Sequence, residues 1–337
     1  MHRSLPLFLG LVTACGGDVV RDAGARDGGA LDAASPDAAS PDDAGAAPDW
    51  RTEPRMPEVS QEIAVAVHDG RIVVAGGFVA GAISSAVQIF DPSTGSWTDG
   101  PALPEPRHHM SLVSHDGDLY ALGGMASIAF SPVATAWVLR SGQATWQAIA
   151  SLPAERGAAA AGSVRDEIAI VGGNVEAGRL ATETLVYDPA ADAWRFGAPI
   201  PTLREHLAAV SVDRELWVLG GRLNSTSTNQ VAVEIYDGAT DTWRDGPPMP
   251  TARGGFAAAA RAGELFVHGG ETDRDAVATI DRLDLATMTW SAMPPSLSPH
   301  HGHGLVALDG RLYAVGGGRR PGFAAIDVVE SCACDAR

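Results

Sequence analysis

The chain has 337 residues, of which 45% are hydrophobic, and it carries a formal net charge of −17. This length fits one large all-β domain or two ordinary domains. The acidic balance argues against nucleic acid as a partner, because phosphate binding needs a concentrated basic surface. Plentiful glycine and scarce aromatic residues favour many short strands joined by tight turns over long helices.

Residues 1–14 have the pattern of a signal peptide and are kept out of the fold. Arg3 supplies the positive start, and the apolar run from Leu5 to Ala14 is too short to cross a bilayer as a helix. The sequence Val12-Thr13-Ala14-Cys15 resembles the lipobox of bacterial lipoproteins. That resemblance implies cleavage before Cys15, lipidation of Cys15 and attachment to a membrane of the bacterial cell envelope. The alternative is an ordinary cleaved signal peptide in which Cys15 is incidental.

Residues 15–49 are rich in Asp, Ala, Gly and Pro and contain almost no large apolar side chain. Such a segment buries too little surface to offset its chain entropy, so we expect a disordered tether. The folded domain is expected at 50–331, and a Cys-x-Cys tail is expected at 332–337.

The folded region contains six copies of one unit. Each copy ends an apolar run with a Gly pair, at Gly76-Gly77, Gly123-Gly124, Gly172-Gly173, Gly220-Gly221, Gly269-Gly270 and Gly316-Gly317. A Trp lies 26 residues before each pair, at Trp50, Trp97, Trp146, Trp194, Trp243 and Trp290. Turns such as Asp69-Gly70, set between apolar runs, are a strong hairpin signal. The unit is therefore four short antiparallel strands in 47 to 49 residues, the length of a propeller blade.

The paired glycines, the Tyr-Asp dipeptide and the Trp six residues later resemble the Kelch repeat. The resemblance covers residues 50 to about 330 and implies blades around a channel, with strand a innermost and strand d outermost. The last copy lacks its Trp, whereas Trp50 has no strands before it. We therefore expect the segment at Trp50 to supply the outer strand of the last blade and leave no free sheet edge. The predicted fold is all-β, a single six-bladed β-propeller.

A d–a connection joins the outer strand of one blade to the inner strand of the next. In each of these connections one position lies 16 residues before the Gly pair, and it is occupied by Ser60, Arg107, Arg156, Arg204, Arg253 and His300. In Kelch proteins an Arg here commonly lines the ligand-binding mouth. The resemblance therefore implies ligand-binding roles for Arg107, Arg156, Arg204, Arg253 and His300. The alternative is a structural role, in which each Arg hydrogen-bonds loop carbonyls between blades.

Two residues further along, strand alternation places a second set on the channel side, namely Glu62, His109, Ala158, His206, Gly255 and Gly302. We predict that Glu62, His109 and His206 contact a ligand. Because they come from separate blades, joint ligation of a metal is possible only in a narrow bore. No metal and no other cofactor is predicted.

The stretch His300–Gly304, "HHGHG", contains three of the ten histidines. His303 belongs to a mostly apolar set that should pack between blades and point away from His300. His301 and His303 share a side in the manner of a metal pair, but no carboxylate or thiol is placed to complete a site. The pattern therefore favours packing over metal binding.

Two enzyme classes with Kelch propellers offer a test. Copper-radical oxidases of the galactose oxidase type need two Tyr, two His and a Cys, but the four Tyr of this chain occupy repeat positions and the ring lacks a Cys. Bacterial Kelch sialic acid mutarotases use a Glu and an Arg. The loop "GGNVEAGR" is loosely similar to that pattern and would make Glu176 and Arg179 catalytic, although polar loops are the norm at this point of the repeat.

Cys332 and Cys334 could pair with each other, pair with a second chain or stay free. The sequence as a whole predicts a lipid-anchored envelope Kelch propeller that acts as a binding or interaction module through its Arg-lined face. Its ligand would be a protein or a carbohydrate. The alternatives are a periplasmic enzyme acting on an acidic sugar and a scaffold with no small ligand.

Overall fold

The computed structural model describes residues 50–176 and 178–334. The predicted signal peptide, lipobox and tether therefore lie outside the described residues, as do residues 335–337 of the predicted tail. Within the described ranges no helix combines the length and the hydropathy needed to cross a membrane.

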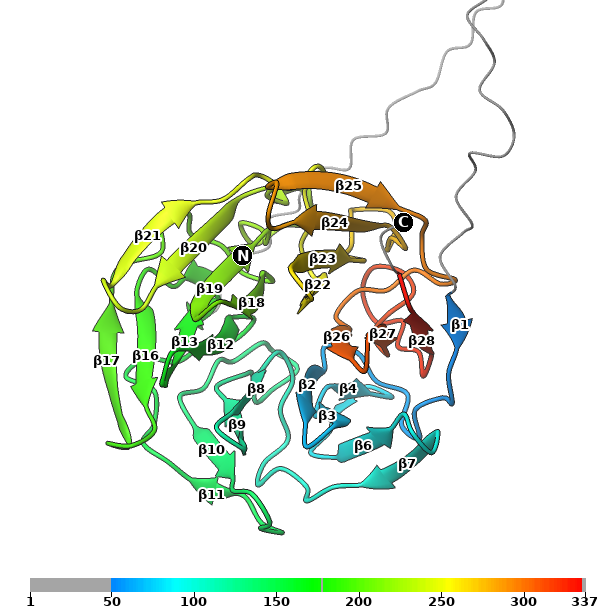
Figure 1. The fold of residues 1–337 in the computed structure, drawn as a ribbon. Helices are drawn as coiled ribbons and strands as arrows, with labels where there is room; N and C mark the ends of the chain where they lie inside the picture. The colour runs from blue at the N-terminus through cyan, green and yellow to red at the C-terminus, as the bar shows by residue number, and fades with distance from the viewer. Residues whose placement is uncertain (1–49, 177, 335–337) are drawn as a thin grey trace, which may run out of the picture. The chain divides into compact units, whose positions relative to one another are not determined.

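Six four-stranded antiparallel sheets surround a central channel as the blades of a propeller (Figure 1). From the inner to the outer strand, the first blade consists of β2 Ala64–His68, β3 Arg71–Ala75, β6 Val87–Asp91 and β7 Ser96–Asp99. The second consists of β8 Ser111–His115, β9 Asp118–Leu122, β10 Ala136–Leu139 and β11 Gln147–Ala148. The third consists of β12 Ala160–Val164, β13 Glu167–Val171, β16 Thr184–Asp188 and β17 Ala193–Gly197. The next two are β18 Ala208–Val212, β19 Glu215–Leu219, β20 Val233–Asp237, β21 Thr242–Asp245; and β22 Ala257–Arg261, β23 Glu264–His268, β24 Ile280–Asp284, β25 Thr289–Met293. The six inner strands together line a cavity of about 350 Å³ along the channel.

The sixth blade joins the two ends of the described chain. It consists of β26 Gly304–Leu308, β27 Arg311–Val315, β28 Val329–Cys332 and β1 Arg51–Thr52. In β1, Arg51 lies opposite Ser331 of β28, and the blue strand lies beside the red one in Figure 1. The predicted closure is confirmed. The expectation that no sheet edge stays free is wrong, because each blade is a separate sheet whose outer strand forms an edge.

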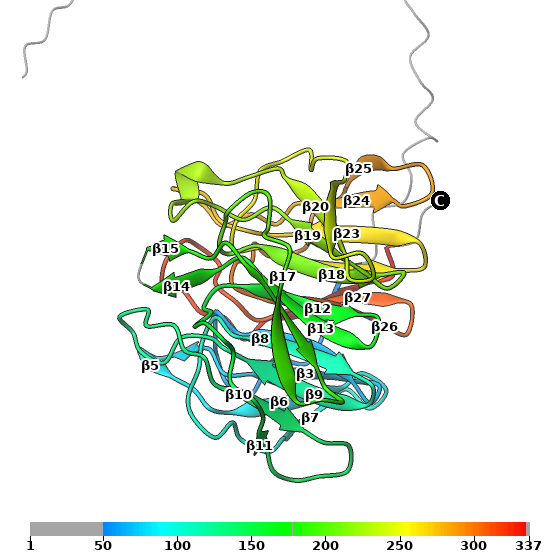
Figure 2. The ribbon, with the colours of Figure 1, turned by 90° about the vertical axis from the view of Figure 1, so that its left-hand side faces the viewer.

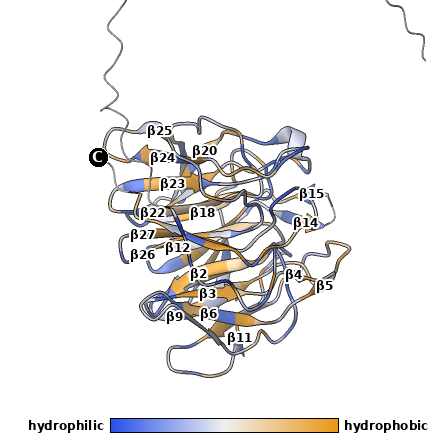
Figure 3. Ribbon diagram, turned by 90° about the vertical axis from the view of Figure 1, so that its right-hand side faces the viewer, coloured by the Kyte–Doolittle hydropathy of each residue, from blue (hydrophilic) through white to orange (hydrophobic). Residues whose placement is uncertain are grey.

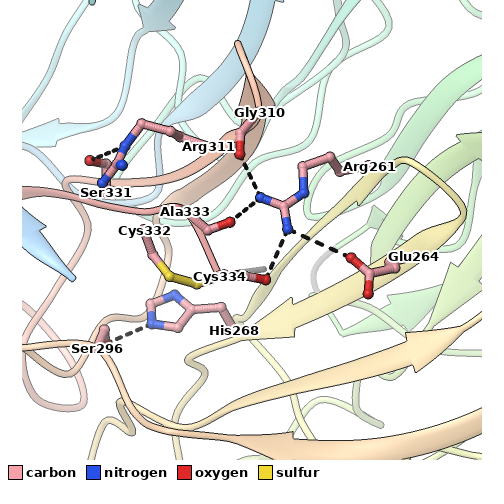
Figure 4. The surroundings of a disulfide bond; sticks show 10 residues. All are labelled: Arg261, Glu264, His268, Ser296, Gly310, Arg311, Ser331, Cys332, Ala333 and Cys334. Carbon is pink, nitrogen blue, oxygen red and sulfur yellow. Dashed lines mark hydrogen bonds and ion pairs between the residues drawn. A yellow bond between two sulfur atoms is a disulfide. The ribbon is translucent and has the colours of Figure 1, made fainter. Parts of the chain in front are cut away.

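The end of β28 is buried more deeply than a tail would be. Cys332 and Cys334 are 0% and 3% exposed, and their sulfur atoms are bonded to each other. Arg261 donates to the carbonyl oxygens of Gly310 and Cys334 over 2.7 and 2.9 Å and also contacts that of Ala333 (Figure 4). The last turn of the described chain is thereby attached to the fifth and sixth blades.

The Gly pairs join neighbouring blades. The second glycine of each pair donates its N–H across the blade boundary, over 2.7 to 3.0 Å, to the carbonyl oxygens of Arg107, Arg156, Arg204, Arg253, His300 and Ser60 in turn. In five of the six pairs a Cβ on the first glycine would collide with the same carbonyl, at 2.3 Å between Gly76 and Arg107. Both glycines of that pair also have positive φ, 67° at Gly76 and 104° at Gly77. The repeat therefore needs glycine for its backbone conformation and for the close approach of two blades.

The apolar core lies between the blades rather than at one centre. One cluster packs Val73 of β3 against Leu119 of β9 and Trp137 of β10, and five similar clusters follow around the ring. Figure 3 shows hydrophobic residues along β2 and β3. Five of the repeat Trp residues donate their indole N–H over 2.7 to 3.0 Å to the connection that enters their own blade, at Pro54, Pro101, Ala150, Ala198 and Pro247.

Candidate functional site

The d–a connections and the loops that follow the Gly pairs share one face of the propeller, which we call the b–c face. Two short hairpins project from it, β4 Phe78–Val79 with β5 Ala82–Ile83 and β14 Asn174–Glu176 with β15 Arg179–Leu180 (Figure 2). The sequence placed the functional residues on this face.

The four predicted arginines do not reach the mouth of the channel. Arg107, Arg156, Arg204 and Arg253 are between 0% and 2% exposed. Each guanidinium bonds inside its own blade, as Arg204 does with Glu234 at 2.5 Å and Arg253 with Asp281 at 2.8 Å. A buried cation is stable only when it is paired and hydrogen-bonded, which explains this placement. The arrangement corresponds to the structural alternative, although the partners belong to the same blade.

The other two blades with Arg follow the same rule. Arg107 contacts the carboxylate of Glu105 and donates to Thr135 Oγ1 at 2.9 Å. Arg156 donates to the carbonyl of Glu183 at 3.1 Å. His300 is also fully buried, with Nδ1 2.8 Å from the carbonyl of Gly316. All five groups are buried, so none of them presents an exposed donor to a ligand on the b–c face.

The second predicted set does meet at the channel. All six positions have left-handed backbone, with φ of 54° at Glu62, 50° at His109, 53° at Ala158, 51° at His206, 65° at Gly255 and 54° at Gly302. Each residue donates its N–H over 2.7 to 3.1 Å to the carbonyl of the same position in the preceding blade. These hydrogen bonds form a closed circle around the channel, which we call the central ring. The circle holds a backbone conformation that is uncommon for residues other than glycine.

Three ionisable side chains of the central ring lie close to one another. His109 Nε2 lies 3.1 Å from Glu62 Oε2 and 2.9 Å from His206 Nε2. One side-chain atom from each of Glu62, His109 and His206 lies within 4.8 Å of the other two. The bore is therefore narrow enough for the three groups to bind one atom together. The small side chain of Ala158 and the two glycines of the ring leave a cavity of about 150 Å³ beside them.

A second layer of charge supports the ring, and the sequence did not show that its residues meet there. Arg222 donates to Glu205 at 3.0 Å through Nε and to Glu271 at 2.6 Å through Nη1. Glu205 also contacts Nδ1 of His206. The residue after the Arg position forms a backbone bridge with the residue after the Gly pair, as Glu205 does with Arg222. This pairing of the two positions recurs in the repeat, so the sequence could have indicated that Glu205 lies beside Arg222.

The pKa values of all three ring groups are lowered, for different reasons. Burial raises the pKa of Glu62, but His109, His301 and His206 together lower it well below its usual range. Burial is the main cause that lowers the pKa of His109 and of His206, and the charge of Arg222 acts in the same direction. Near neutral pH the ring therefore presents one carboxylate and two neutral imidazoles.

Two of the "HHGHG" histidines, His300 and His303, lie together beside His268, and His301 lies beside Glu62. His303 packs between blades five and six, as predicted, with Nε2 2.9 Å from His268 Nδ1. The prediction that it points away from His300 is wrong, because the two rings lie 5.2 Å apart. The left-handed backbone of Gly302, φ 54°, breaks the strand alternation on which that prediction relied.

His301 lies on the other side of this turn, in the second layer. Its Nδ1 lies 3.6 Å from Glu62 Oε1 and 3.6 Å from Glu271 Oε2, two carboxylates that the sequence did not place beside it. Burial lowers the pKa of His301, but its hydrogen bond to Glu62 and the charges of Glu62 and Glu271 raise it overall. The two carboxylates thus favour the protonated form of His301.

A cleft of about 270 Å³ lies on the b–c face beside the central ring, lined by Met125, Phe130, Asn174, Gly178, Glu205, His206, Arg222 and Asn224. Neither Glu176 nor Arg179, the two weak catalytic candidates, lines this cleft. Their side chains are 69% and 63% exposed and pair with each other at 3.2 Å. The structure therefore does not bring them to Glu62, His109 and His206.

The b–c face is also unusually apolar. Of the ten exposed large hydrophobic residues in the described chain, eight belong to its loops, namely Val59, Ile128, Phe130, Leu203, Leu223, Val231, Leu297 and Phe323. A groove of about 590 Å³ between Phe78 and Phe323 has a mostly apolar lining. Phe78 contacts Phe323 edge to face, with ring centroids 5.0 Å apart. Apolar patches of this kind mark interaction surfaces.

Comparison with known proteins agrees with this geometry. A family model described as the KLHDC2/KLHL20/DRC7 Kelch-repeats domain matches residues 151–318, and a Kelch motif model matches residues 62–104. Kelch-like protein 35 of Mus musculus is 32% identical over 84 residues, which are 25% of this chain and 15% of that protein. Beta-scruin of Limulus polyphemus is 31% identical over 93 residues, 28% of this chain and 10% of that protein. The matched regions are thus a small part of each relative.

The solved structure of YjhT is similar in fold, with a TM-score of 0.71 at 15% sequence identity. The match covers 82% of this chain and 95% of YjhT. The repeat, the two matching models and the closed ring of six blades agree with one another. This chain is a Kelch-repeat β-propeller protein.

Proposed function

We propose that this protein is an interaction module of the bacterial cell envelope, which binds a partner protein across the b–c face of its propeller. The observation that carries the proposal is the concentration of exposed apolar side chains on that face, eight of ten among the described residues. A monomeric surface rarely gathers apolar groups in this way unless another molecule covers them. The role is the predicted one, but the apolar loops rather than the buried arginines would make the contacts.

The apolar groove gives the partner an anchoring point. Phe323, which is 65% exposed, lines this groove. The ring of Phe130 lies 6.1 Å from that of Phe78, measured between ring centroids. Aromatic residues that a partner covers completely contribute most of the binding energy at protein interfaces. We therefore expect Phe130 and Phe323 to dominate the affinity.

Substitution on the two sides of the molecule tests this role. Phe130→Ser with Phe323→Ser removes two apolar groups from the b–c face, and Phe196→Ser with Met288→Ser removes two exposed groups outside it. Proteins crosslinked to the full chain in envelope extract are quantified for each variant. The proposal is supported if one protein is captured by the wild type and by the Phe196→Ser, Met288→Ser control, and if its capture by the Phe130→Ser, Phe323→Ser variant falls by about tenfold or more. Equal capture by all three proteins would refute it.

A carbohydrate ligand is the other outcome. If neutral sugars raise the unfolding temperature and no protein shows the differential capture, the module binds a carbohydrate instead of a protein. A ligand at about 100 times its dissociation constant stabilises a folded protein by roughly 2.7 kcal/mol. No observation on Glu176 or Arg179 favours an enzyme acting on an acidic sugar, because the two residues pair with each other outside the cleft.

The envelope location is part of the same proposal. It is supported by the lipobox-like Val12-Thr13-Ala14-Cys15 and the polar segment that follows it. Expression in a bacterial host with labelled fatty acid should label the wild type and leave Cys15→Ser unlabelled. Label on both proteins, or on neither, contradicts lipidation at Cys15.

A further inference from the structure

We propose that Glu62, His109 and His206 of the central ring bind a divalent metal ion of the zinc class. The site is independent of the proposed protein interaction, and the three residues come from separate blades. Two imidazoles and one carboxylate are an established ligand set for Zn²⁺ and for other first-row ions that keep an open coordination position.

The distances fit shared ligation. His109 Nε2 is already within 3.1 Å of Glu62 Oε2 and within 2.9 Å of His206 Nε2. Tetrahedral ligands at about 2.0–2.1 Å from zinc stand a little more than 3 Å apart, so only small movements of the side chains are required. An ion bound to both Nε2 atoms would lie to one side of the line that joins them, because 2.9 Å is shorter than two Zn–N bonds end to end.

The neighbours of the ligands hold them as a metal site requires. Glu205 contacts Nδ1 of His206, the ring nitrogen that faces away from His109, and Arg222 holds Glu205 at 3.0 Å. A carboxylate on the far nitrogen of a ligating His fixes the tautomer and the orientation of the imidazole. Nδ1 of His109 lies 2.5 Å from Nδ1 of His108, so here the partner is a second imidazole instead of a carboxylate. Both ligands thus present Nε2 to the centre.

The backbone preorganises the three ligands. Each sits at the same left-handed position of its blade, and the closed circle of backbone hydrogen bonds fixes their spacing. The rest of the circle is Ala158, Gly255 and Gly302, whose small side chains leave the cavity of about 150 Å³. His206 lines both that cavity and the cleft on the b–c face, so an ion here would keep a coordination position within reach of the cleft.

The charge of the surroundings also favours a cation. Glu62, Glu205 and Glu271 bring three carboxylates to the site, against the guanidinium of Arg222 and the imidazole of His301. Oxygen ligands are too few for Mg²⁺ or Ca²⁺, which prefer all-oxygen shells. The ligand set therefore favours Zn²⁺ over these ions.

Calorimetric titration of the full chain, freed of metal with EDTA, tests the site. We expect one equivalent of Zn²⁺ to bind with a dissociation constant below about 1 μM and no comparable binding of Mg²⁺. His109→Gln, His206→Gln and Glu62→Gln should each weaken Zn²⁺ binding by about 100-fold or more, and Glu205→Gln by about 10-fold because it only positions His206. His68→Gln is the matched control, since His68 lies on β2 and bonds to Ser114 at 3.0 Å.

Circular dichroism and unfolding temperature in EDTA show whether each variant folds. If one does not fold, Co²⁺ bound to the wild-type protein provides a second measurement. A visible spectrum of four- or five-coordinate Co²⁺ without a sulfur charge-transfer band supports nitrogen and oxygen ligands. The proposal is overturned by absent stoichiometric binding, by equal loss in His68→Gln, or by a sulfur band, which would place the ion at a cysteine. The Phe130→Ser, Phe323→Ser variant should bind Zn²⁺ as the wild type does. A failure of the metal proposal can therefore be distinguished from a failure of the proposed protein interaction.

Discussion

Two positions that lie two residues apart in every repeat have opposite roles in this propeller. The first, occupied by four arginines, is buried and pairs inside its own blade. The second forms the central ring, where Glu62, His109 and His206 face one another. The repetition of Arg reflects a structural requirement that four of the six blades share. The variation of the ring position, from Gly to Glu and His, shows where this chain departs from the repeat.

The largest effect should come from breaking a buried pair at the first position. Arg204→Ala leaves Glu234, which is 4% exposed, without its cationic partner and should lower the free energy of unfolding by about 3–5 kcal/mol. His206→Ala in the same blade, measured without metal, should cost only about 1 kcal/mol. Urea unfolding of both variants measures the difference. Equal losses would mean that the two positions do not differ in role.

The contact between blades gives the next effect. Gly76 and Gly117 both have positive φ, 67° and 80°, but only a Cβ on Gly76 would meet another atom, the carbonyl oxygen of Arg107 at 2.3 Å. Gly117→Ala should cost about 1 kcal/mol for the backbone conformation alone. Gly76→Ala should cost at least about 1 kcal/mol more, because the blades must move apart. Thermal unfolding of the two variants shows whether the Arg-position carbonyl is a required contact.

Acid should weaken the fold through buried histidines outside the ring. Burial is the main cause that lowers the pKa of His268 and of His303 well below 6.5. The charges of nearby histidines act in the same direction, as does the charge of Arg253 on His268. The unfolded chain then binds more protons as pH falls below about 6.5. The free energy of unfolding should therefore decrease in that window, by at most about 1.4 kcal/mol per pH unit for each His.

In His268→Gln the free energy of unfolding should decrease less steeply than in the wild type between pH 6.5 and pH 5. Urea midpoints at several pH values measure both slopes. A slope that is unchanged by the substitution would show that other groups govern acid unfolding.

The smallest effect is expected on the exposed hairpin. Glu176→Gln and Arg179→Gln remove a pair whose side chains are 69% and 63% exposed, so stability should change by less than about 0.5 kcal/mol. Zn²⁺ affinity and partner capture should also stay unchanged. A loss of either activity would return these residues to the functional site.

The sequence by itself determined the propeller. Gly pairs, Trp residues and Asp-Gly turns recur at a fixed period because each blade is a local unit with the same hairpins and the same contacts to its neighbours. The unpaired Trp50 at one end and the missing Trp at the other were sufficient to predict that β1 closes the ring. The period also placed Glu62, His109 and His206 on the channel side.

The tertiary structure alone decided which of these side chains touch. Strand alternation could not show that the ring residues adopt left-handed backbone, so it misplaced His303 and gave no reason to bring His301 to Glu62. The burial of the arginines also depends on partners such as Glu234 and Asp281, which are about 30 residues away and have no fixed counterpart in every blade. Distances across the channel are set by the closure of all six blades, and no single repeat contains that information.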